Sequence, residues 1–263
     1  MVTSATPLWR PDGWGAVTRV GLLVPHADVG PESEVQAMAP PGVVVHAARA
    51  PFGAMAAGGA MDPTIADAPA RAFAEPPGID EATERLAAAP VGAIGYAFTS
   101  SAYLIGAGGE AAMLARLRER AGDVPLTAAC TAAAEALGAL GVRRLALVHP
   151  PWFDAALAER GAALFGDQGF EVVSSAPADL PSDQRRIEPA ALYDWLVATV
   201  PDAAEGVFIG GNGFRAVGVI EAAEAALGRP VVTANQGLLW ALLRLAGARD
   251  RPRGYGRLFG AAG

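Results

Sequence analysis

An apolar run at 206–209 leads into three glycines within four residues, in the sequence GVFIGGNGFR at 206–215. A segment with helical character follows directly at 216–227. Strand, tight turn and helix start, in this order, leave backbone N–H groups unpaired beside the positive end of a helix, which suits an anion. The chain contains no lysine for a phosphate-binding loop, and Ala216 replaces the last glycine of the dinucleotide pattern. We therefore expect a carboxylate to bind here; a turn that only reverses the chain is the alternative.

Three side chains that can exchange protons also follow predicted strands. His26 and His149 each follow the first strand of one half of the chain, and two imidazoles facing one cleft could move a proton near neutral pH. Each could instead only hydrogen-bond a nearby loop. Cys130 stands at a predicted helix start, where the helix dipole favours a thiolate, but free cysteines are also often small buried residues. Nothing in the spacing of the histidines and Asp28 supports a metal site, so we expect no metal and no cofactor.

The elements that must position these residues alternate along the chain. Predicted strands lie at 17–25, 42–46, 91–98, 124–128, 143–148, 170–174, 206–209 and 230–233. Predicted helices lie at 80–89, 110–120, 131–140, 154–165, 189–200, 216–227 and 236–246. This alternation favours the α/β class with mainly parallel sheets.

The chain also repeats itself. Residues 19–25 resemble 144–150, residues 92–99 resemble 205–212, and residues 125–127 with their helix resemble 230–233 with theirs. We expect two similar α/β domains, one formed by 1–123 plus 234–263 and the other by 124–233, with a cleft between them. Ligands of open α/β sheets bind at the carboxyl ends of the strands. The expected substrate-binding residues follow strands: Asp28, Phe98, Thr99, Ser100, Thr131, Trp152, Gly211, Asn212 and Gly213.

Composition and net charge argue against several classes of binding partner. The 263 residues are 52% hydrophobic and carry a net charge of −7, which gives no basic surface for nucleic acid or anionic lipid. Apolar runs are interrupted before the roughly 18 residues that a membrane span needs, and no signal peptide is evident, so we expect a cytoplasmic protein. With one cysteine, no disulfide can form within the chain. The expected partner is a small carboxylate ligand, and a homo-oligomer is possible.

Several pieces of the chain match a known family in the family's order: GLLVP, GYAFTSS, PLTAACTAAAEALGALGVRRLALV, GFEVV, GVFIGGNGFRAVGVIEAAEAALGRPVV and GYGRLF. Over residues 20–259 the chain resembles the aspartate/glutamate racemase superfamily, on the branch of arylmalonate decarboxylase and maleate cis-trans isomerase. The resemblance implies two pseudo-symmetric, Rossmann-like, three-layer αβα domains. It also implies chemistry by cysteines that follow a strand in each half, and these positions hold Phe98 and Gly211 here.

The resemblance assigns roles to further residues. Thr99, Ser100 and the Asn212 amide match groups that hold a carboxylate or its enediolate, and Arg215 matches an arginine of the isomerase branch, suited to pairing with a carboxylate. Asp28 falls at an asparagine of the isomerase, and Trp152, or Pro151, falls at a family tyrosine. The expected function is a cofactor-independent decarboxylase or isomerase/racemase-like enzyme that stabilises an enediolate, with His26, His149 or Cys130 moving the proton. The alternative is a non-catalytic, carboxylate-binding pseudoenzyme.

Overall fold

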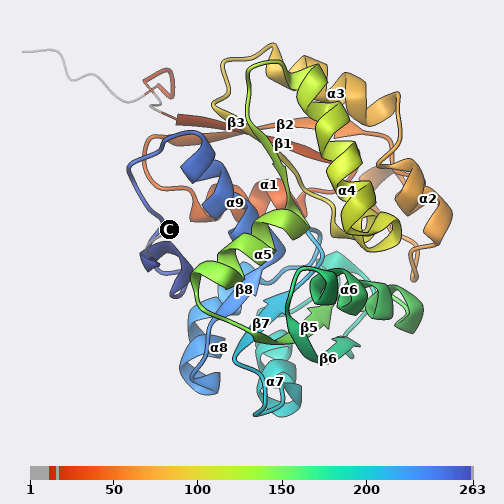
Figure 1. The fold of residues 1–263 in the computed structure, drawn as a ribbon, viewed down its shortest axis with the longest axis vertical. Helices are drawn as coiled ribbons and strands as arrows, with labels where there is room; N and C mark the ends of the chain where they lie inside the picture. Colours follow the sequence, from red (N-terminus) through yellow and green to blue (C-terminus); the bar gives the residue numbers. More distant parts are fainter. Residues whose placement is uncertain (1–11, 16–17, 262–263) are drawn as a thin grey trace, which may run out of the picture.

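Two four-stranded parallel sheets form the framework of the protein (Figure 1). The computed structural model describes residues 12–15 and 18–261. The first sheet has the order β2-β1-β3-β4, built from β1 (Thr18–Pro25), β2 (Val43–Ala50), β3 (Ala93–Tyr96) and β4 (Leu126–Ala128). The second has the order β6-β5-β7-β8, built from β5 (Arg144–His149), β6 (Glu171–Pro177), β7 (Gly206–Ile209) and β8 (Val231–Thr233). The two orders are the same, which confirms the predicted α/β class and the repeat of the sequence.

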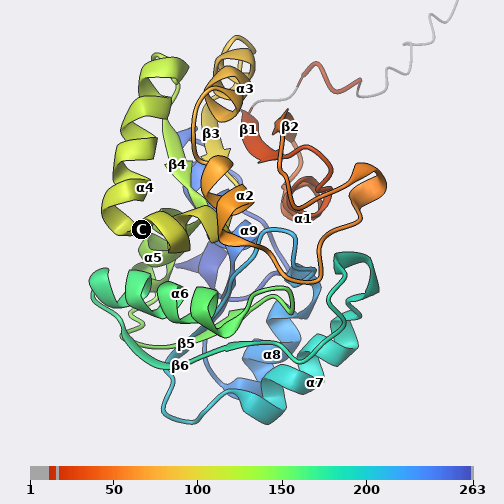
Figure 2. The ribbon, with the colours of Figure 1, turned by 90° about the vertical axis from the view of Figure 1, so that its right-hand side faces the viewer.

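Helices cover both sheets and connect them (Figures 1 and 2). The α-helices are α1 (Gly30–Met38), α2 (Asp67–Ala72), α3 (Gly78–Ala87), α4 (Thr99–Ala121), α5 (Ala129–Ala139), α6 (Ala155–Asp167), α7 (Pro189–Thr199), α8 (Ile220–Leu227) and α9 (Ala234–Leu245). Short 3-10 helices are η1 (Ala57–Gly59), η2 (Gln184–Arg186), η3 (Val217–Val219) and η4 (Leu258–Gly260). Helices α1 and α9 contact each other and the first sheet, α3 and α4 do the same, and α4 contacts α6 across the two halves. No helix of the described residues is long and apolar enough to span a bilayer.

The sequence of each element explains where it starts. The inner strands are apolar because both faces of their sheets are covered, as in β1, where seven of eight residues are buried, whereas the edge strands β2 and β6 are mostly half-buried or exposed. Helix α9 begins with a capping box in which Thr233 and Gln236 exchange side-chain-to-backbone hydrogen bonds. Helix α7 begins at Pro189, whose missing N–H costs nothing at a first helical position. Strands β7 and β8 pair in parallel, with Ile209 opposite Thr233, so the turns that follow them lie next to each other.

The predicted boundary between the domains is wrong at one strand. Residues 124–128 were expected in the second domain, but β4 pairs with β3, with Leu126 opposite Ile94 and Ala128 opposite Tyr96. The hydrogen-bonding partner decides to which sheet a strand belongs, and neighbourhood along the chain does not. Helix α5, which follows β4, contacts β8 and α9, so the chain crosses between the halves here. The expected start of the first domain, at residues 1–11, lies outside the described part of the chain.

Candidate active site

The carboxyl ends of strands from both sheets meet at one small cavity. Eight of the residues expected to bind substrate line it: Asp28, Phe98, Thr99, Ser100, Trp152, Gly211, Asn212 and Gly213. The loops touch closely, since a Cβ on Gly30 would lie 3.1 Å from the Cα of Gly213. The cavity has a volume of about 20 Å³, which is room for about one water molecule. The cleft is therefore present but closed in this conformation.

A segment of the first half, residues 51–66, closes the cleft, and we refer to it as the flap. It contributes four apolar side chains to the cavity: Phe52, Met55, Met61 and Ile65. A single antiparallel bridge joins Met55 to Met61 within the flap. The flap is tied to the second half by the bond from the Ile65 amide to the Trp152 carbonyl, at 3.0 Å. With Phe98 and Trp152, the flap gives the cavity mainly hydrophobic walls.

The glycine turn that follows β7 is only partly available to a ligand. The amide of Gly211 donates to the hydroxyl oxygen of Thr99 at 3.0 Å, so this part of the expected carboxylate cradle is satisfied within the protein. Among the described residues, the amides of Asn212 and Gly213 have no acceptor. Gly211 has a φ of 84°, and a Cβ there would lie 2.2 Å from Cγ of Pro150. This turn requires glycine where the resemblance places a cysteine.

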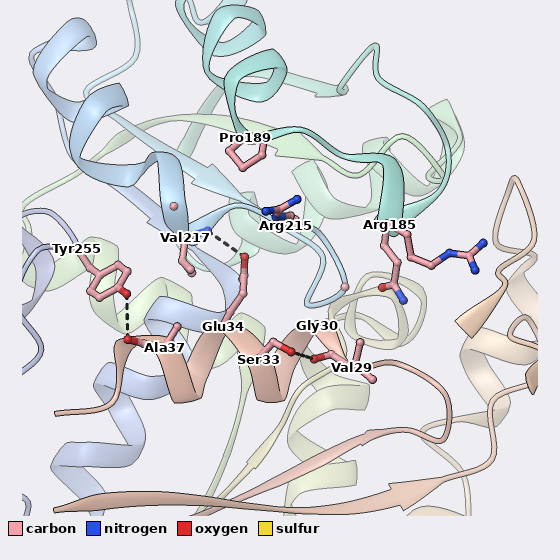
Figure 3. Close-up of a pocket in the computed structure, with 13 residues that line it drawn as sticks. Val29, Gly30, Ser33, Glu34, Ala37, Arg185, Pro189, Arg215, Val217 and Tyr255 are labelled. Carbon is pink, nitrogen blue, oxygen red and sulfur yellow. Dashed lines mark hydrogen bonds between the residues drawn. The ribbon is translucent and has the colours of Figure 1, made fainter. Parts of the chain in front are cut away.

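A buried network that the sequence did not indicate holds the glycine turn in place. Asn212 donates to Asn235 at 2.8 Å, and Asn235 donates to Glu34 at 2.7 Å and to the Asn212 carbonyl at 2.9 Å. Glu34 also accepts from the amides of Ala216 at 2.6 Å and Val217 at 3.0 Å (Figure 3). Burial raises the pKa of Glu34 to about 7. Glu34 belongs to the first half, so its carboxylate fixes a turn of the second.

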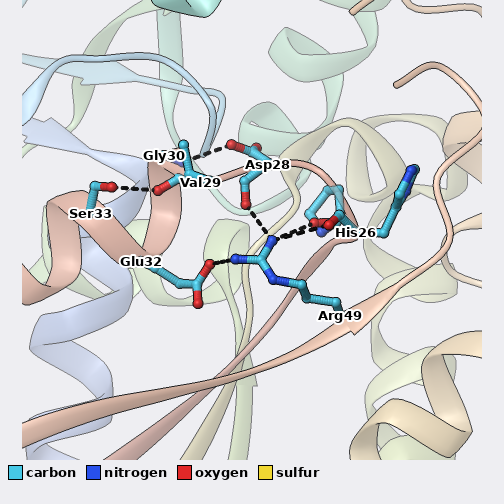
Figure 4. Close-up of polar contacts among 8 residues, drawn as sticks. His26, Asp28, Val29, Gly30, Glu32, Ser33 and Arg49 are labelled. Carbon is cyan, nitrogen blue, oxygen red and sulfur yellow. Dashed lines mark hydrogen bonds and ion pairs between the residues drawn. The ribbon is translucent and has the colours of Figure 1, made fainter. Parts of the chain in front are cut away.

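Asp28 is the ionisable side chain that lines the cavity. It is 5% exposed, and its Oδ1 accepts from the Gly30 amide at 2.8 Å. Arg49 donates to the Asp28 carbonyl at 2.9 Å and to the carbonyls of Pro25 and His26, and it pairs with Glu32 (Figure 4). Burial raises the pKa of Asp28 to about 6, against the opposing effects of the Gly30 amide and Arg49.

Gln184 joins Asp28 to the glycine turn. In the orientation that satisfies both ends of its amide group, the nitrogen donates to Oδ1 of Asp28 at 3.1 Å and to the Gly213 carbonyl at 3.2 Å. A Cβ on Gly213 would lie 2.9 Å from Oδ2 of Asp28, so the carboxyl group lies directly against the turn. A carboxyl group with a pKa near 6 can hold or accept a proton close to neutral pH.

The two histidines do not meet in the cleft, so the predicted proton shuttle between them is wrong. His26 is exposed and lines a separate groove, and its Nδ1 accepts from the Phe52 amide at 3.1 Å. His149 is fully buried, with Nε2 at 2.8 Å from the hydroxyl of Ser175 and its ring stacked on Phe153. Burial lowers the pKa of His149 to about 3, so it is neutral. His149 is the last residue of β5, whereas His26 follows β1, so the two side chains do not occupy equivalent positions.

Three further predicted residues lie away from the cavity. Cys130 is fully buried, with its sulfur 4.0 Å from the Thr99 carbonyl, and burial raises the pKa of the thiol well above its usual value. The dipole of α5 therefore does not make Cys130 a thiolate. Thr131 donates to Glu110 at 2.8 Å on the other side of α5. Arg215 is exposed and lines a different pocket. Among residues 12–15 and 18–261, no three His, Cys, Asp or Glu side chains are grouped as a metal ion would require.

Known proteins are similar to this chain in sequence and in fold. The family model described as arylmalonate decarboxylase matches residues 54–259. The chain is 34% identical over 168 residues to arylmalonate decarboxylase of Bordetella bronchiseptica, covering 61% of this chain and 68% of the relative. A double mutant of arylmalonate decarboxylase in its liganded form superimposes with a TM-score of 0.77 at 26% identity, over 94% of this chain and 100% of the other.

Maleate isomerase Iso from Pseudomonas putida S16 shares the fold, with a TM-score of 0.80 at 21% identity over 93% of this chain and 99% of the other. The relatives are thus a decarboxylase and an isomerase, and they confirm the predicted superfamily branch and its two-domain α/β fold. On the family match and the shared sequence, the chain belongs to the arylmalonate decarboxylase family.

Proposed function

We propose that this protein is a cofactor-independent lyase or isomerase of small carboxylates in which Asp28 moves the proton. One observation carries the proposal: the Asp28 carboxyl group, with a pKa of about 6, lines the cavity that also holds Thr99, Ser100 and the glycine turn. It is the group of the cavity able to exchange a proton near neutral pH, because His26, His149 and Cys130 lie elsewhere.

The reaction that fits these groups passes through an enediolate. The unpaired amides of Asn212 and Gly213, with the hydroxyls of Thr99 and Ser100, would donate to the substrate carboxylate and to the charge that develops on it. In a decarboxylation, the carbon–carbon bond breaks, carbon dioxide leaves, and the electron pair stays on the enediolate. Protonated Asp28 then donates its proton to that carbon and regains one from solvent. In α-proton exchange, ionised Asp28 removes the proton from the carbon beside the carboxylate, exchanges it with solvent and returns a solvent proton to the same face.

The relatives are a decarboxylase and an isomerase, and these two reaction types can be distinguished here because no thiol lines the cavity. A maleate isomerase of Nocardia farcinica has been solved with a covalently bound succinylcysteine intermediate, which requires a cysteine nucleophile. Here the single cysteine is Cys130, fully buried in α5. Proton transfer beside a carboxylate needs no nucleophile, and apolar walls such as Phe98 and Trp152 favour loss of a charged carboxylate group. Decarboxylation is therefore favoured over isomerisation by addition.

Substrate can enter only if the cleft opens. A dicarboxylate is far larger than a cavity of about 20 Å³, so the flap has to move away from Trp152. Among the described residues, two hydrogen bonds hold the flap to the second half: the amide of Ile65 donates to the Trp152 carbonyl, and the hydroxyl of Ser182 donates to the Pro63 carbonyl. We propose that flap opening admits the substrate and that closure excludes water from the reaction.

A substrate panel tests the proposal. Phenylmalonate, methyl-phenylmalonate and maleate are incubated with the protein in D2O and followed by proton NMR. We expect turnover or deuterium incorporation on at least one of them, with a loss of at least about 100-fold in Asp28→Asn. The control is His26→Gln, which lies outside the cavity and should keep the wild-type rate. Equal rates for wild type and Asp28→Asn would refute the assignment.

The second candidate is a protein that binds a carboxylate without turning it over. It is favoured by the bond between Gly211 and Thr99, which satisfies part of the cradle, and by the seven apolar or aromatic side chains that fill the cleft. In that case dicarboxylates raise the melting temperature, and no member of the panel is converted or exchanges a proton.

A further inference from the structure

A second pocket lies on the other side of the glycine turn, and two of its lining residues, Glu34 and Gln184, are the side chains that hold the turn in place. It has a volume of about 440 Å³, in the range of small-molecule sites. Its walls are α1, the turn at 213–218 and the loop at 184–189 (Figure 3). Gly213 is the one residue that also lines the closed cavity. The two sites are therefore separate.

The pocket offers an apolar surface. Val29, Ala37, Pro189 and Val217 form much of its lining. The polar groups around them are already satisfied: Ser33 donates to the Val29 carbonyl at 2.7 Å, and the Tyr255 hydroxyl donates to the Ala37 carbonyl at 2.9 Å. Both oxygens of Glu34 accept hydrogen bonds within the protein. A ligand therefore finds hydrophobic contacts here and few free polar partners.

Arg215 is the exception, because its charge has no partner. Its one hydrogen bond runs from Nη1 to the Ile187 carbonyl at 3.4 Å. Among the described residues, no carboxylate oxygen lies within 4.0 Å of its guanidinium group. Arg185, the other cation of the lining, is paired with Asp183 at 2.9 Å, and its side chain points away from the pocket while that of Arg215 lies between Glu34 and Pro189 (Figure 3). A guanidinium group has five N–H donors and favours carboxylates.

We infer that this pocket binds a small organic anion with one carboxylate group and an apolar body. The carboxylate pairs with Arg215, and a ring or short alkyl chain lies against Val29, Ala37 and Val217. One charge is matched and not two, because Arg185 is neutralised by Asp183 and Glu34 presents no donor. The apolar body distinguishes this ligand from inorganic anions, which Arg215 alone would hold only weakly in water.

Titration calorimetry with phenylacetate, hexanoate and the neutral isostere phenylacetamide tests the inference. We expect both carboxylates to bind and the amide to bind at least about tenfold more weakly, since a hydrogen-bonded charge is lost. Arg215→Gln should weaken phenylacetate binding about tenfold to a hundredfold, and the matched control Arg185→Gln should leave it unchanged. Asp28→Asn, in the other site, should also leave it unchanged.

A blocking variant locates the site independently of charge. Ala37→Trp, at an exposed position of α1, fills the pocket and should abolish binding, while Gln36→Trp, exposed on the same helix but outside the lining, should not. Melting temperatures of all variants show that they fold. Equal binding of acid and amide, unchanged binding in Arg215→Gln or Ala37→Trp, or no binding of any probe would overturn the inference. So would occupation of the pocket by a second copy, seen as a dimer by sedimentation that Ala37→Trp dissociates.

Discussion

Raising the pH from 5 to 7 should destabilise this protein, and Glu110→Gln should remove a defined part of that effect. Glu110 is 2% exposed, its Oε2 accepts from Thr131 at 2.8 Å, and burial raises its pKa to about 7. In the folded protein it is therefore protonated at pH 5 to 6, while in the unfolded chain it is ionised above its ordinary pKa of 4.5. The folded state binds more protons, so stability is lost as the pH rises through the folded pKa.

The magnitude follows from the pKa difference. Each carboxyl group of this kind costs about 1.4 kcal/mol per pH unit between its unfolded and folded pKa values, or about 3 kcal/mol in all for Glu110. Asp28 and Glu34, with pKa values raised to about 6 and about 7, act in the same direction. His149, whose pKa is lowered to about 3, acts in the opposite direction below pH 6.5. Between pH 5 and 6 the three carboxyl groups outweigh the one imidazole, so the combined slope of these four groups is negative.

Glu110 is the clean test of this reasoning. The charge of Asp28 contributes to the raised pKa of Glu34, whereas the pKa of Glu110 is set by burial and its bond to Thr131. Guanidinium unfolding at pH 5, 6 and 7 should give Glu110→Gln a slope shallower than wild type by about 1.4 kcal/mol per pH unit. The exposed Glu119→Gln on the same helix is the control and should keep the wild-type slope. Identical slopes in wild type and Glu110→Gln would show that the burial argument is wrong.

Three other perturbations follow from the site. Glu34→Ala removes the acceptor of the Ala216, Val217 and Asn235 donors, and chemical unfolding should show a loss of about 3 kcal/mol or more, with full stability contradicting the network. Gly211→Cys meets Pro150 at a φ of 84° and should lower the melting temperature without creating activity; a stable, active variant would contradict the strain argument. Arg49→Ala removes a cation that lowers the pKa of Asp28, so the pH profile of turnover should move to higher pH, and an unmoved profile would count against Asp28.

Local sequence patterns predicted the fold well, for a physical reason. Apolar runs ended by glycine or proline mark buried parallel strands, and the repeat of such units along the chain is visible before any contact is known. The assignment of β4 failed because its partner, β3, is decided by pairing across a helix of 23 residues. Local sequence patterns predict the strand and the helix, but they do not indicate with which strand of which sheet β4 pairs.

The sequence predicted which loops line the cavity, but not which side chains in them could move a proton. The rule that ligands bind after strands brought together Asp28, Thr99 and Asn212, and the same rule applied to β8 could have found Asn235. Glu34 lies 201 residues from Asn235, and no local pattern indicates that contact. Side-chain direction was the main source of error: His149, the last residue of β5, is buried in the core, and His26, which follows β1 in the other sheet, is exposed.

The pH dependence of turnover in wild type and Asp28→Asn tests the central claim most directly. With a substrate converted by the wild type, kcat/KM should change around pH 6, where Asp28 gains or loses its proton. The change should be absent in Asp28→Asn, whose remaining rate should be at least about 100-fold lower. A wild-type profile that is flat from pH 5 to 8, or one that Asp28→Asn reproduces, would contradict a carboxyl group as the proton-transfer residue of this cleft.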